Sequence, residues 1–428
     1  MPKSGDGMDA RPSAMTYRVN PSLHWSQDGE GTSMVASTQQ IEKPVEKAPV
    51  TQNPRLPSLT GMRFVAAAMV FFFHVVWLAN MFGSPEAKVV LETLFGRLGF
   101  VGVGFFFVLS GFVLAWSVRT RDRAPAFWRR RFFKIYPSHL VTYVAAFLLV
   151  TLVAQQAISG EAGILNLLLL HAWFPQMDIR FSVNPIAWSL ACEALFYLMF
   201  PLLMRYIRRI RPERLWAWAA GVAVVILAVP VVAGLLPYQM RFPSPAVTDT
   251  AHWFIYTFPP VRMLDFVFGI LLARMVMTGR KLPLGLGGSV ALAVIVYTLT
   301  PLLPGGYSLG PTMVVPLGFV IAAAAVNDAK KLPSWLSGRV MGWLGEVSYA
   351  FYLWNALVLV YGHKLLADSQ GLSTPLAIGM VVLLFGVTLL LSWLLFSLVE
   401  RPIMRRFATS RRSRDGEPQS VARRGTGG

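Results

Sequence analysis

Two ionisable side chains, Arg63 and His74, occur inside the first apolar segment of the chain, residues 59–76. In an α-helix, eleven residues make about three turns, so these two side chains would share one face about 16 Å apart. An arginine at the centre of a bilayer costs about 3 kcal/mol, so the pair indicates a polar cleft between helices. A histidine in such a cleft can transfer a proton or attack an acyl carbon. The alternative is that both side chains only form hydrogen bonds to neighbouring helices.

A second set of polar side chains lies in the apolar segment 185–204. Ser189, Glu193 and Tyr197 follow one another at intervals of four residues, which places them on one face of a helix. A glutamate inside a membrane must be protonated, ion-paired or hydrogen-bonded, and Arg63 and His74 are its expected partners. A Glu–His contact would orient the imidazole and raise its basicity. We therefore expect His74, Arg63 and Glu193 to meet across two helices.

A basic cluster, residues 129–134, leads directly into another apolar segment and contains Arg130, Arg131 and Lys134. Several cations at the mouth of a membrane cleft can hold a polyphosphate such as the nucleotide part of coenzyme A. The alternative is a cluster that only anchors the helix at the cytoplasmic membrane surface. Further polar or amphipathic side chains at span ends and breaks are expected to line the same cleft: Ser110, Trp188, Ser189, Tyr197, Tyr349 and Asn355.

The glycine-rich segment 99–111 resembles a nucleotide-binding loop only superficially, because neither a preceding strand nor a βαβ unit is expected. Close packing between helices is the better explanation of its small residues. The spacing of histidine, cysteine and acidic residues predicts no metal site.

The composition is that of a membrane protein. Of 428 residues, 55% are hydrophobic and 14% are charged, whereas soluble domains contain about 25% charged residues. Many apolar runs approach the length of about 20 residues that a membrane-spanning helix requires. The net charge of +18 is concentrated in short loops and the C-terminal tail, a placement that favours helix orientation and contact with anionic lipid over nucleic-acid binding.

These observations predict an all-α, polytopic membrane bundle of about ten helices, with both termini cytoplasmic. The loops that would then face the cytoplasm hold eighteen Lys and Arg residues, and the opposite loops hold five. The stretch 164–174 is too short to cross, so we expect a re-entrant or surface helix there. Residues 1–53 are expected to be a disordered cytoplasmic extension, 54–402 the membrane domain and 403–428 a disordered basic tail. The expected spans are 56–82, 97–118, 136–155, 185–204, 215–236, 259–277, 284–302, 312–327, 343–366 and 375–399.

Six motifs, in order along residues 56–402, resemble those of acyltransferase family 3, the bacterial integral membrane O-acyltransferases. They are Arg63-x10-His74, the segments 101–112 and 130–137, Trp188-Ser-Leu-x-x-Glu-x-x-Phe-Tyr197, Ser348-Tyr-x-x-Tyr-Leu-Trp354 and Glu400-Arg-Pro402. The resemblance implies that His74 is catalytic, that Arg63 supports it and that the basic cluster serves the acyl donor. Two departures are Lys134, where the family usually has a second arginine, and Asn355, where it often has a histidine.

The resemblance implies a bacterial inner-membrane enzyme that moves an acetyl or other short acyl group from acyl-CoA to a hydroxyl group. The acceptor would be a surface polysaccharide, a glycolipid or a glycosylated metabolite. His74 would act as general base or would accept the acyl group itself, and no tightly bound cofactor is expected. Membrane lipids and the two substrates are the expected partners, and nucleic acid is not. The alternative hypothesis is a transporter or flippase that uses the same charges as a substrate pathway.

Overall fold

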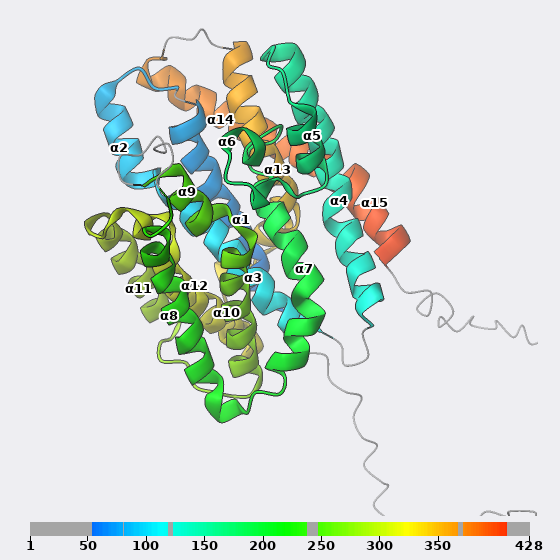
Figure 1. Cartoon of the computed structure of the whole chain (residues 1–428), viewed down its shortest axis with the longest axis vertical. Coiled ribbons are helices and arrows are strands. Elements are labelled where there is room, and N and C mark those ends of the chain that lie inside the picture. Colours follow the sequence, from blue (N-terminus) through cyan, green and yellow to red (C-terminus); the bar gives the residue numbers. More distant parts are fainter. Residues whose placement is uncertain (1–53, 80, 119–122, 238–246, 367–370, 409–428) are drawn as a thin grey trace, which may run out of the picture. The chain divides into compact units, whose positions relative to one another are not determined.

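The computed structural model describes residues 54–79, 81–118, 123–237, 247–366 and 371–408. This part of the chain is a bundle of helices (Figure 1), and its described residues contain only an isolated bridge, Phe82–Leu372, in place of any strand. The predicted extension 1–53 and most of the predicted tail lie outside the described residues. Residues 403–408, assigned to the tail above, instead continue the helical path that follows Glu400.

The long helices come in the predicted order (Figure 1). Their bounds are α1 Pro57–His74, α3 Leu98–Ser117, α4 Ala124–Leu148, α7 Trp188–Ile207, α8 Leu215–Ala233, α10 Pro259–Met277, α11 Leu286–Leu299, α12 Val314–Ala329, α13 Arg339–Leu366 and α14 Thr374–Leu395. Shorter helices are α2 Pro85–Phe95, α5 Gly160–Leu167, α6 Met177–Arg180, α9 Asp249–His252 and α15 Arg401–Ile403. Single-turn or π-helical extensions include η1 Val75–Ala79, η2 Leu149–Val153, η3 His171–Trp173, η5 Trp253–Thr257, η10 Phe396–Glu400 and η11 Met404–Ala408.

The all-α polytopic architecture is confirmed, and every predicted span coincides with a helix. Eight helices in the described residues are long and apolar enough to cross a membrane. The remaining two predicted spans are α10, which carries three charged side chains, and α11, which is too short to be counted with them. The stretch 164–174 forms the end of α5 and the turn η3, which are too short to cross, as expected.

The first helix is held at its N-terminus by an acidic residue from another helix. Pro57 occupies the first helical turn, where its missing N–H costs no hydrogen bond. The carboxylate of Asp328, at the end of α12, accepts hydrogen bonds from the Ser58 backbone N–H at 2.9 Å and the Ser58 hydroxyl at 2.6 Å. A negative charge at this position also interacts favourably with the helix dipole. These contacts fix the end of α1 that carries Arg63.

Two glycines bring α3 and α10 into backbone contact. A Cβ on Gly111 would lie 2.0 Å from the carbonyl oxygen of Phe266, and one on Gly269 would lie 2.0 Å from that of Val108. The glycine-rich segment therefore serves close helix packing, as predicted. The first helix, α1, packs against both α3 and α13. Its contact with α13 is aromatic, and the rings of Phe64 and Phe351 are centred 5.5 Å apart. Together α1, α3, α4, α7 and α13 enclose the candidate site.

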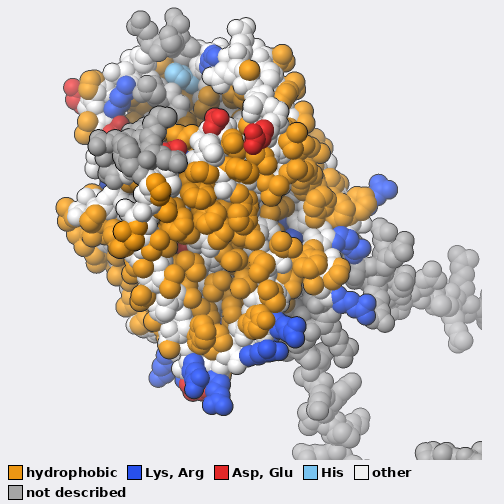
Figure 2. All heavy atoms as spheres, in the orientation of Figure 1, with side chains coloured by type: hydrophobic (Ala, Val, Ile, Leu, Met, Phe, Trp, Pro, Cys, Tyr) orange, Lys and Arg blue, Asp and Glu red, His pale blue; other side chains and the backbone are white. Residues whose placement is uncertain are grey.

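The surface shows how the described bundle meets its environment. Figure 2 shows hydrophobic side chains covering a broad part of the visible face, with Lys and Arg gathered along its lower edge. This edge includes the turn between α7 and α8 (Figure 1), one of the loops that the charge distribution assigns to the cytoplasm. The distribution is the one expected of a helical membrane protein with a basic cytoplasmic face.

Candidate functional site

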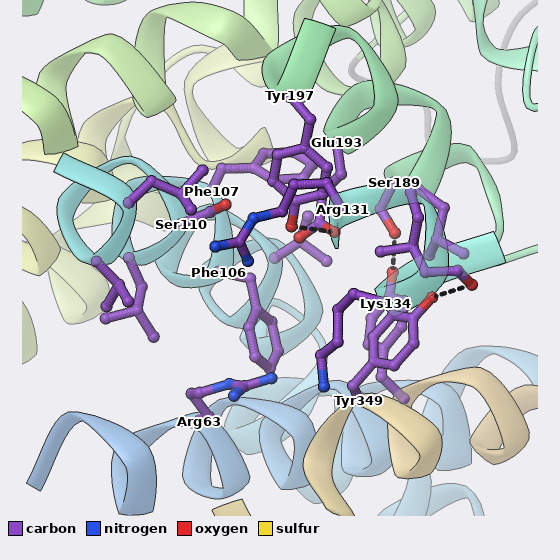
Figure 3. Close-up of a pocket in the computed structure, with 17 residues that line it drawn as sticks. Arg63, Phe106, Phe107, Ser110, Arg131, Lys134, Ser189, Glu193, Tyr197 and Tyr349 are labelled. Carbon is purple, nitrogen blue, oxygen red and sulfur yellow. Dashed lines mark hydrogen bonds between the residues drawn. The ribbon is translucent and has the colours of Figure 1, made fainter. Parts of the chain in front are cut away.

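A cavity of about 150 Å³ lies among five helices, α1, α3, α4, α7 and α13 (Figure 3). Aromatic and aliphatic side chains of α3, such as Phe106 and Phe107, form much of its wall. Its polar lining comes from all five helices: Arg63, Ser110, Arg131, Lys134, Ser189, Glu193, Tyr197, Tyr349 and Tyr352. All but the last of these were predicted as site residues. Tyr352 was not, although it stands in one of the quoted motifs.

The polar face predicted on α7 is present and points into this cavity. Ser189, Glu193 and Tyr197 all line it. The Tyr197 hydroxyl donates to Glu193 Oε2 at 3.1 Å, and the hydroxyls of Ser189 and Tyr352 lie 2.8 Å apart. Figure 3 shows both contacts as dashed lines. Each polar group on this face therefore has a partner, which a membrane interior requires.

The three cations of the cavity differ in the groups that compensate their positive charge. Lys134 forms an ion pair with Glu400, a residue that is 2% exposed. Arg131 lies over the rings of Phe127 and Tyr197, at 5.4 and 5.6 Å from their centres. Among the described residues, Arg63 has no ion pair. Three cations against the carboxylates of Glu193 and Glu400 leave an excess of positive charge, which favours an anionic ligand.

A second, wider cavity of about 540 Å³ shares Arg63 and Lys134 with the first. It lies nearer the start of α13 and the end of α14, on the side predicted to be cytoplasmic. Besides the two shared cations, its lining consists of Trp343, Glu346, Trp393, Phe396, Ser397, Glu400, Arg401, Met404 and Arg405. Arg63 and Lys134 therefore border both an outer basic cavity and an inner one. We call them the mouth cavity and the inner cavity.

Glu400 is a site residue that the sequence analysis did not assign. It stands in the quoted Glu400-Arg-Pro402 motif, and it is buried beside Lys134. A lysine at membrane depth needs a counter-charge, and few acidic residues occur in the C-terminal spans. That requirement was the signal that could have identified it.

His74 lies outside the inner cavity, at the last residue of α1. Its Nδ1 is 2.5 Å from Oδ1 of Asn355 on α13, and the side chain is 8% exposed. The Asn355 amide nitrogen donates to the backbone carbonyls of Tyr352 at 2.6 Å and Phe351 at 3.5 Å. Because these two carbonyls can only accept, they orient the amide with its oxygen toward the imidazole. A neutral His74 then carries its proton on Nδ1, which leaves a lone pair on Nε2.

The predicted meeting of His74, Arg63 and Glu193 is therefore wrong in one respect. Arg63 and Glu193 line the same cavity, but the hydrogen-bond partner of His74 is Asn355 and that of Glu193 is Tyr197. The reason is the length of α1: three helical turns, about 16 Å, separate Arg63 from His74 along the axis. Glu193 lines the inner cavity together with Tyr197 and Arg131, whereas His74 is the last residue of α1, about three turns beyond Arg63.

Three further predicted residues do not line the inner cavity: Asn355, which contacts His74 instead, Trp188 and Arg130. Trp188, expected in the cleft, is 4% exposed and packs in the core, with its ring centred 4.6 Å from that of Tyr256. Arg130 is half-buried and lies outside the lining, whereas its neighbour Arg131 is part of it. Successive residues on a helix point about 100° apart, so the cluster 129–134 cannot direct all its cations inward. Within the described residues, no three His, Cys, Asp or Glu side chains come together to hold a metal ion.

Comparisons with known proteins identify the family of the chain. A family model described as an acyltransferase domain matches residues 56–397. The chain is 38% identical over 359 residues to the acyltransferase MdmB of Streptomyces mycarofaciens, covering 82% of this chain and 92% of that protein. It is 23% identical to the peptidoglycan O-acetyltransferase OatA of Listeria monocytogenes and 22% identical to the O-acetyltransferase OatA of Staphylococcus aureus.

The last two alignments cover 81% and 83% of this chain but 56% and 58% of those relatives, so the chain spans little more than half of their length. No solved structure matches. The matched family and the named relatives are acyltransferases, which favours the enzyme hypothesis over the transporter hypothesis.

Proposed function

Since the chain belongs to this acyltransferase family and is a membrane O-acyltransferase, we propose that it moves a short acyl group from acyl-CoA to a hydroxyl of a carbohydrate-containing acceptor. Acetyl is the favoured acyl group, because two relatives are named O-acetyltransferases. One of these relatives is named for peptidoglycan, a carbohydrate polymer. The acceptor is a surface polysaccharide, a glycolipid or a glycosylated metabolite. The enzyme is located in the bacterial inner membrane.

The observation that most supports this proposal is the contact between His74 Nδ1 and Asn355 Oδ1, from which the tautomer of His74 is assigned. With its proton held on Nδ1 by Asn355, the neutral imidazole presents the Nε2 lone pair that a general base needs. Nε2 takes the proton of the acceptor hydroxyl while the hydroxyl oxygen attacks the thioester carbonyl. When the carbon–sulfur bond breaks, the imidazolium returns this proton to the coenzyme A thiolate. Asn355 holds the ring in place throughout by accepting from Nδ1.

The donor is proposed to enter through the mouth cavity. Its phosphates would be held by Arg63, Arg131 and Lys134, because guanidinium and ammonium groups form charge-assisted hydrogen bonds to phosphate. The rings of Trp343 and Trp393 in the mouth cavity offer apolar surface for the nucleotide base. The pantetheine arm would then extend along the inner cavity toward Tyr352 and, beyond it, the His74–Asn355 pair. In this scheme Arg63 serves the donor, because three helical turns separate it from the reacting atoms.

The same lone pair permits a second route, in which Nε2 of His74 attacks the thioester and becomes acylated before the acceptor arrives. The two routes differ in one measurable respect. Purified protein incubated with radiolabelled acetyl-CoA and no acceptor would retain the label covalently only if an acyl-histidine forms.

The function is tested by the transfer of labelled acetyl groups from acetyl-CoA to a hydroxylated carbohydrate acceptor, using the full chain in native membranes. We expect turnover by the wild type and a loss of about 10²–10⁴-fold for His74→Ala, the range that a general base contributes. His363→Ala serves as a control, because this histidine also belongs to a long helix but lies about two helical turns beyond Asn355 on α13. Full activity of His74→Ala, with normal membrane insertion, would contradict the proposed mechanism.

A further inference from the structure

A third cavity lies away from the acyl-transfer site, among α7, α8 and α10. It is a groove of about 640 Å³. Its floor is apolar and includes Leu203 and Ile207 of α7, Val222 of α8, and Val267 and Leu271 of α10. One end of the groove reaches the turn that joins α7 to α8, at the lower edge of Figure 1. None of its lining residues has a part in the mechanism proposed above.

Three arginines of that turn, Arg209, Arg211 and Arg214, border the groove. All three are exposed, and no described acidic residue forms an ion pair with any of them. The acidic residue of the turn, Glu213, is already paired with Arg280 at 2.8 Å. A cluster of three uncompensated guanidinium groups above an apolar floor is complementary to a ligand with a phosphate group at one end and a long apolar body.

The turn is held in place independently of any ligand. Arg274 of α10 donates to the backbone carbonyls of Arg208 at 3.3 Å and Ile210 at 3.5 Å. Together with the Arg280–Glu213 ion pair, these contacts tie the turn to the end of α10. The three arginines of the groove are therefore presented by a braced turn, which lowers the cost of ordering them around a ligand.

The position of the groove indicates a lipid rather than a soluble phosphate compound. Tyr206 and Trp218, which line it, are 57% and 55% exposed, and such rings are enriched where a helix leaves the hydrocarbon region. The α8 segment is among the least buried of the candidate spans, with 22% of its residues buried within the protein. The apolar floor thus continues onto a surface that lipid chains would cover.

We propose that this groove is a binding site for an anionic phospholipid. The phosphate group lies among Arg209, Arg211 and Arg214, and one acyl chain follows the apolar floor between α7, α8 and α10. The site would hold the α7 end of the bundle against the cytoplasmic leaflet, and it is independent of the acyl donor.

The test is a lipid titration of the purified full chain in detergent, with binding counted by native mass spectrometry. The probes are dioleoyl phosphatidylglycerol and, as the neutral comparison, dioleoyl phosphatidylcholine. We expect phosphatidylglycerol to bind more tightly to the wild type. Arg209→Ala/Arg214→Ala should weaken its binding by about tenfold or more, because charge-assisted hydrogen bonds to phosphate are lost. The matched control, Lys330→Ala/Arg339→Ala, removes two exposed cations of another basic loop and should leave binding unchanged.

A second variant tests the apolar floor independently, in case the first variant fails to fold. Val222→Trp fills the apolar floor without touching the arginines and should also weaken phosphatidylglycerol binding, while acetyl transfer stays at the wild-type rate. The proposal would be overturned by equal binding of the two lipids, or by equal losses in the groove variant and the control pair. Full competition by soluble glycerol 3-phosphate would also overturn it, because the site would then recognise the phosphate alone.

Discussion

Asn355 should control the rate of acyl transfer through the tautomer of His74, although it touches no substrate. The change Asn355→Leu keeps a side chain of similar size and removes the oxygen that accepts from Nδ1 at 2.5 Å. A buried N–H left without an acceptor costs about 1–3 kcal/mol. The neutral ring can then avoid that cost by carrying its proton on Nε2, which removes the lone pair needed for catalysis.

The expected result is a fall in kcat of about 5- to 150-fold, the factor that corresponds to 1–3 kcal/mol. KM for acetyl-CoA should stay nearly constant, because the cations proposed to hold the donor belong to α1 and α4. A lower kcat at constant KM would distinguish a positioning role of Asn355 from a general loss of structure. Asn355→His should recover part of the activity, because a ring nitrogen can accept from Nδ1 in place of the amide oxygen.

The assay is steady-state acetyl transfer with membranes that contain equal amounts of each variant. Thr388→Val is a suitable control, since it removes a buried hydroxyl of α14 whose hydrogen bond within the described residues is to the Leu384 carbonyl, at 2.7 Å. A kcat for Asn355→Leu equal to that of the control would refute the assignment of the His74 tautomer. A rise in KM with unchanged kcat would refute it as well.

Three further predictions concern the proposed donor site, the turn η3 and the predicted topology. Arg131→Ala should raise KM for acetyl-CoA by about one to two orders of magnitude, because the loss of a charge-assisted hydrogen bond removes about 1.5–3 kcal/mol of binding free energy. The measurement is initial-rate kinetics, and an equal effect of Arg130→Ala would contradict the inward role of Arg131. Burial lowers the pKa of His171 in η3 to about 3. His171 is therefore protonated at a higher pH in the unfolded state than in the folded state, so the free energy of unfolding should fall as the pH drops below about 6.5. Thermal unfolding of His171→Leu should show a weaker pH dependence. A cysteine at Arg209 should react with an impermeant reagent only after cells are opened, and one at Glu161 should react in intact cells; the reverse pattern would refute the topology.

The part of the site that was predicted well depends on short-range periodicity. The four-residue spacing of Ser189, Glu193 and Tyr197 places them on one face of any helix, and the cost of exposing Glu193 to lipid directs that face inward. The same reasoning places Arg63, Arg131 and Lys134 at a cleft. Both inferences need only the geometry of single helices and the chemistry of a bilayer.

The part that was predicted wrongly depends on which helix lies beside which, and at what height. Glu193 was assigned to His74 because both are buried ionisable groups, yet packing of α1 against α13 gives His74 an amide partner instead. Trp188 belongs to the same motif as Ser189, but its ring turns into the core against Tyr256. Relative rotation and axial offset of neighbouring helices arise from contacts between distant segments, which no local pattern records.

The sequence by itself determined the membrane architecture, the ten helical segments and the residue types available for chemistry. These follow from hydrophobic length, helical period and the cost of charge in lipid, which are all local properties. Only the tertiary structure decided that Asn355 selects the tautomer of His74 and that Glu400 balances Lys134. Those pairs join residues 281 and 266 positions apart. They form because close packing of helices brings distant side chains within hydrogen-bonding distance, and because a buried polar group without a partner is costly.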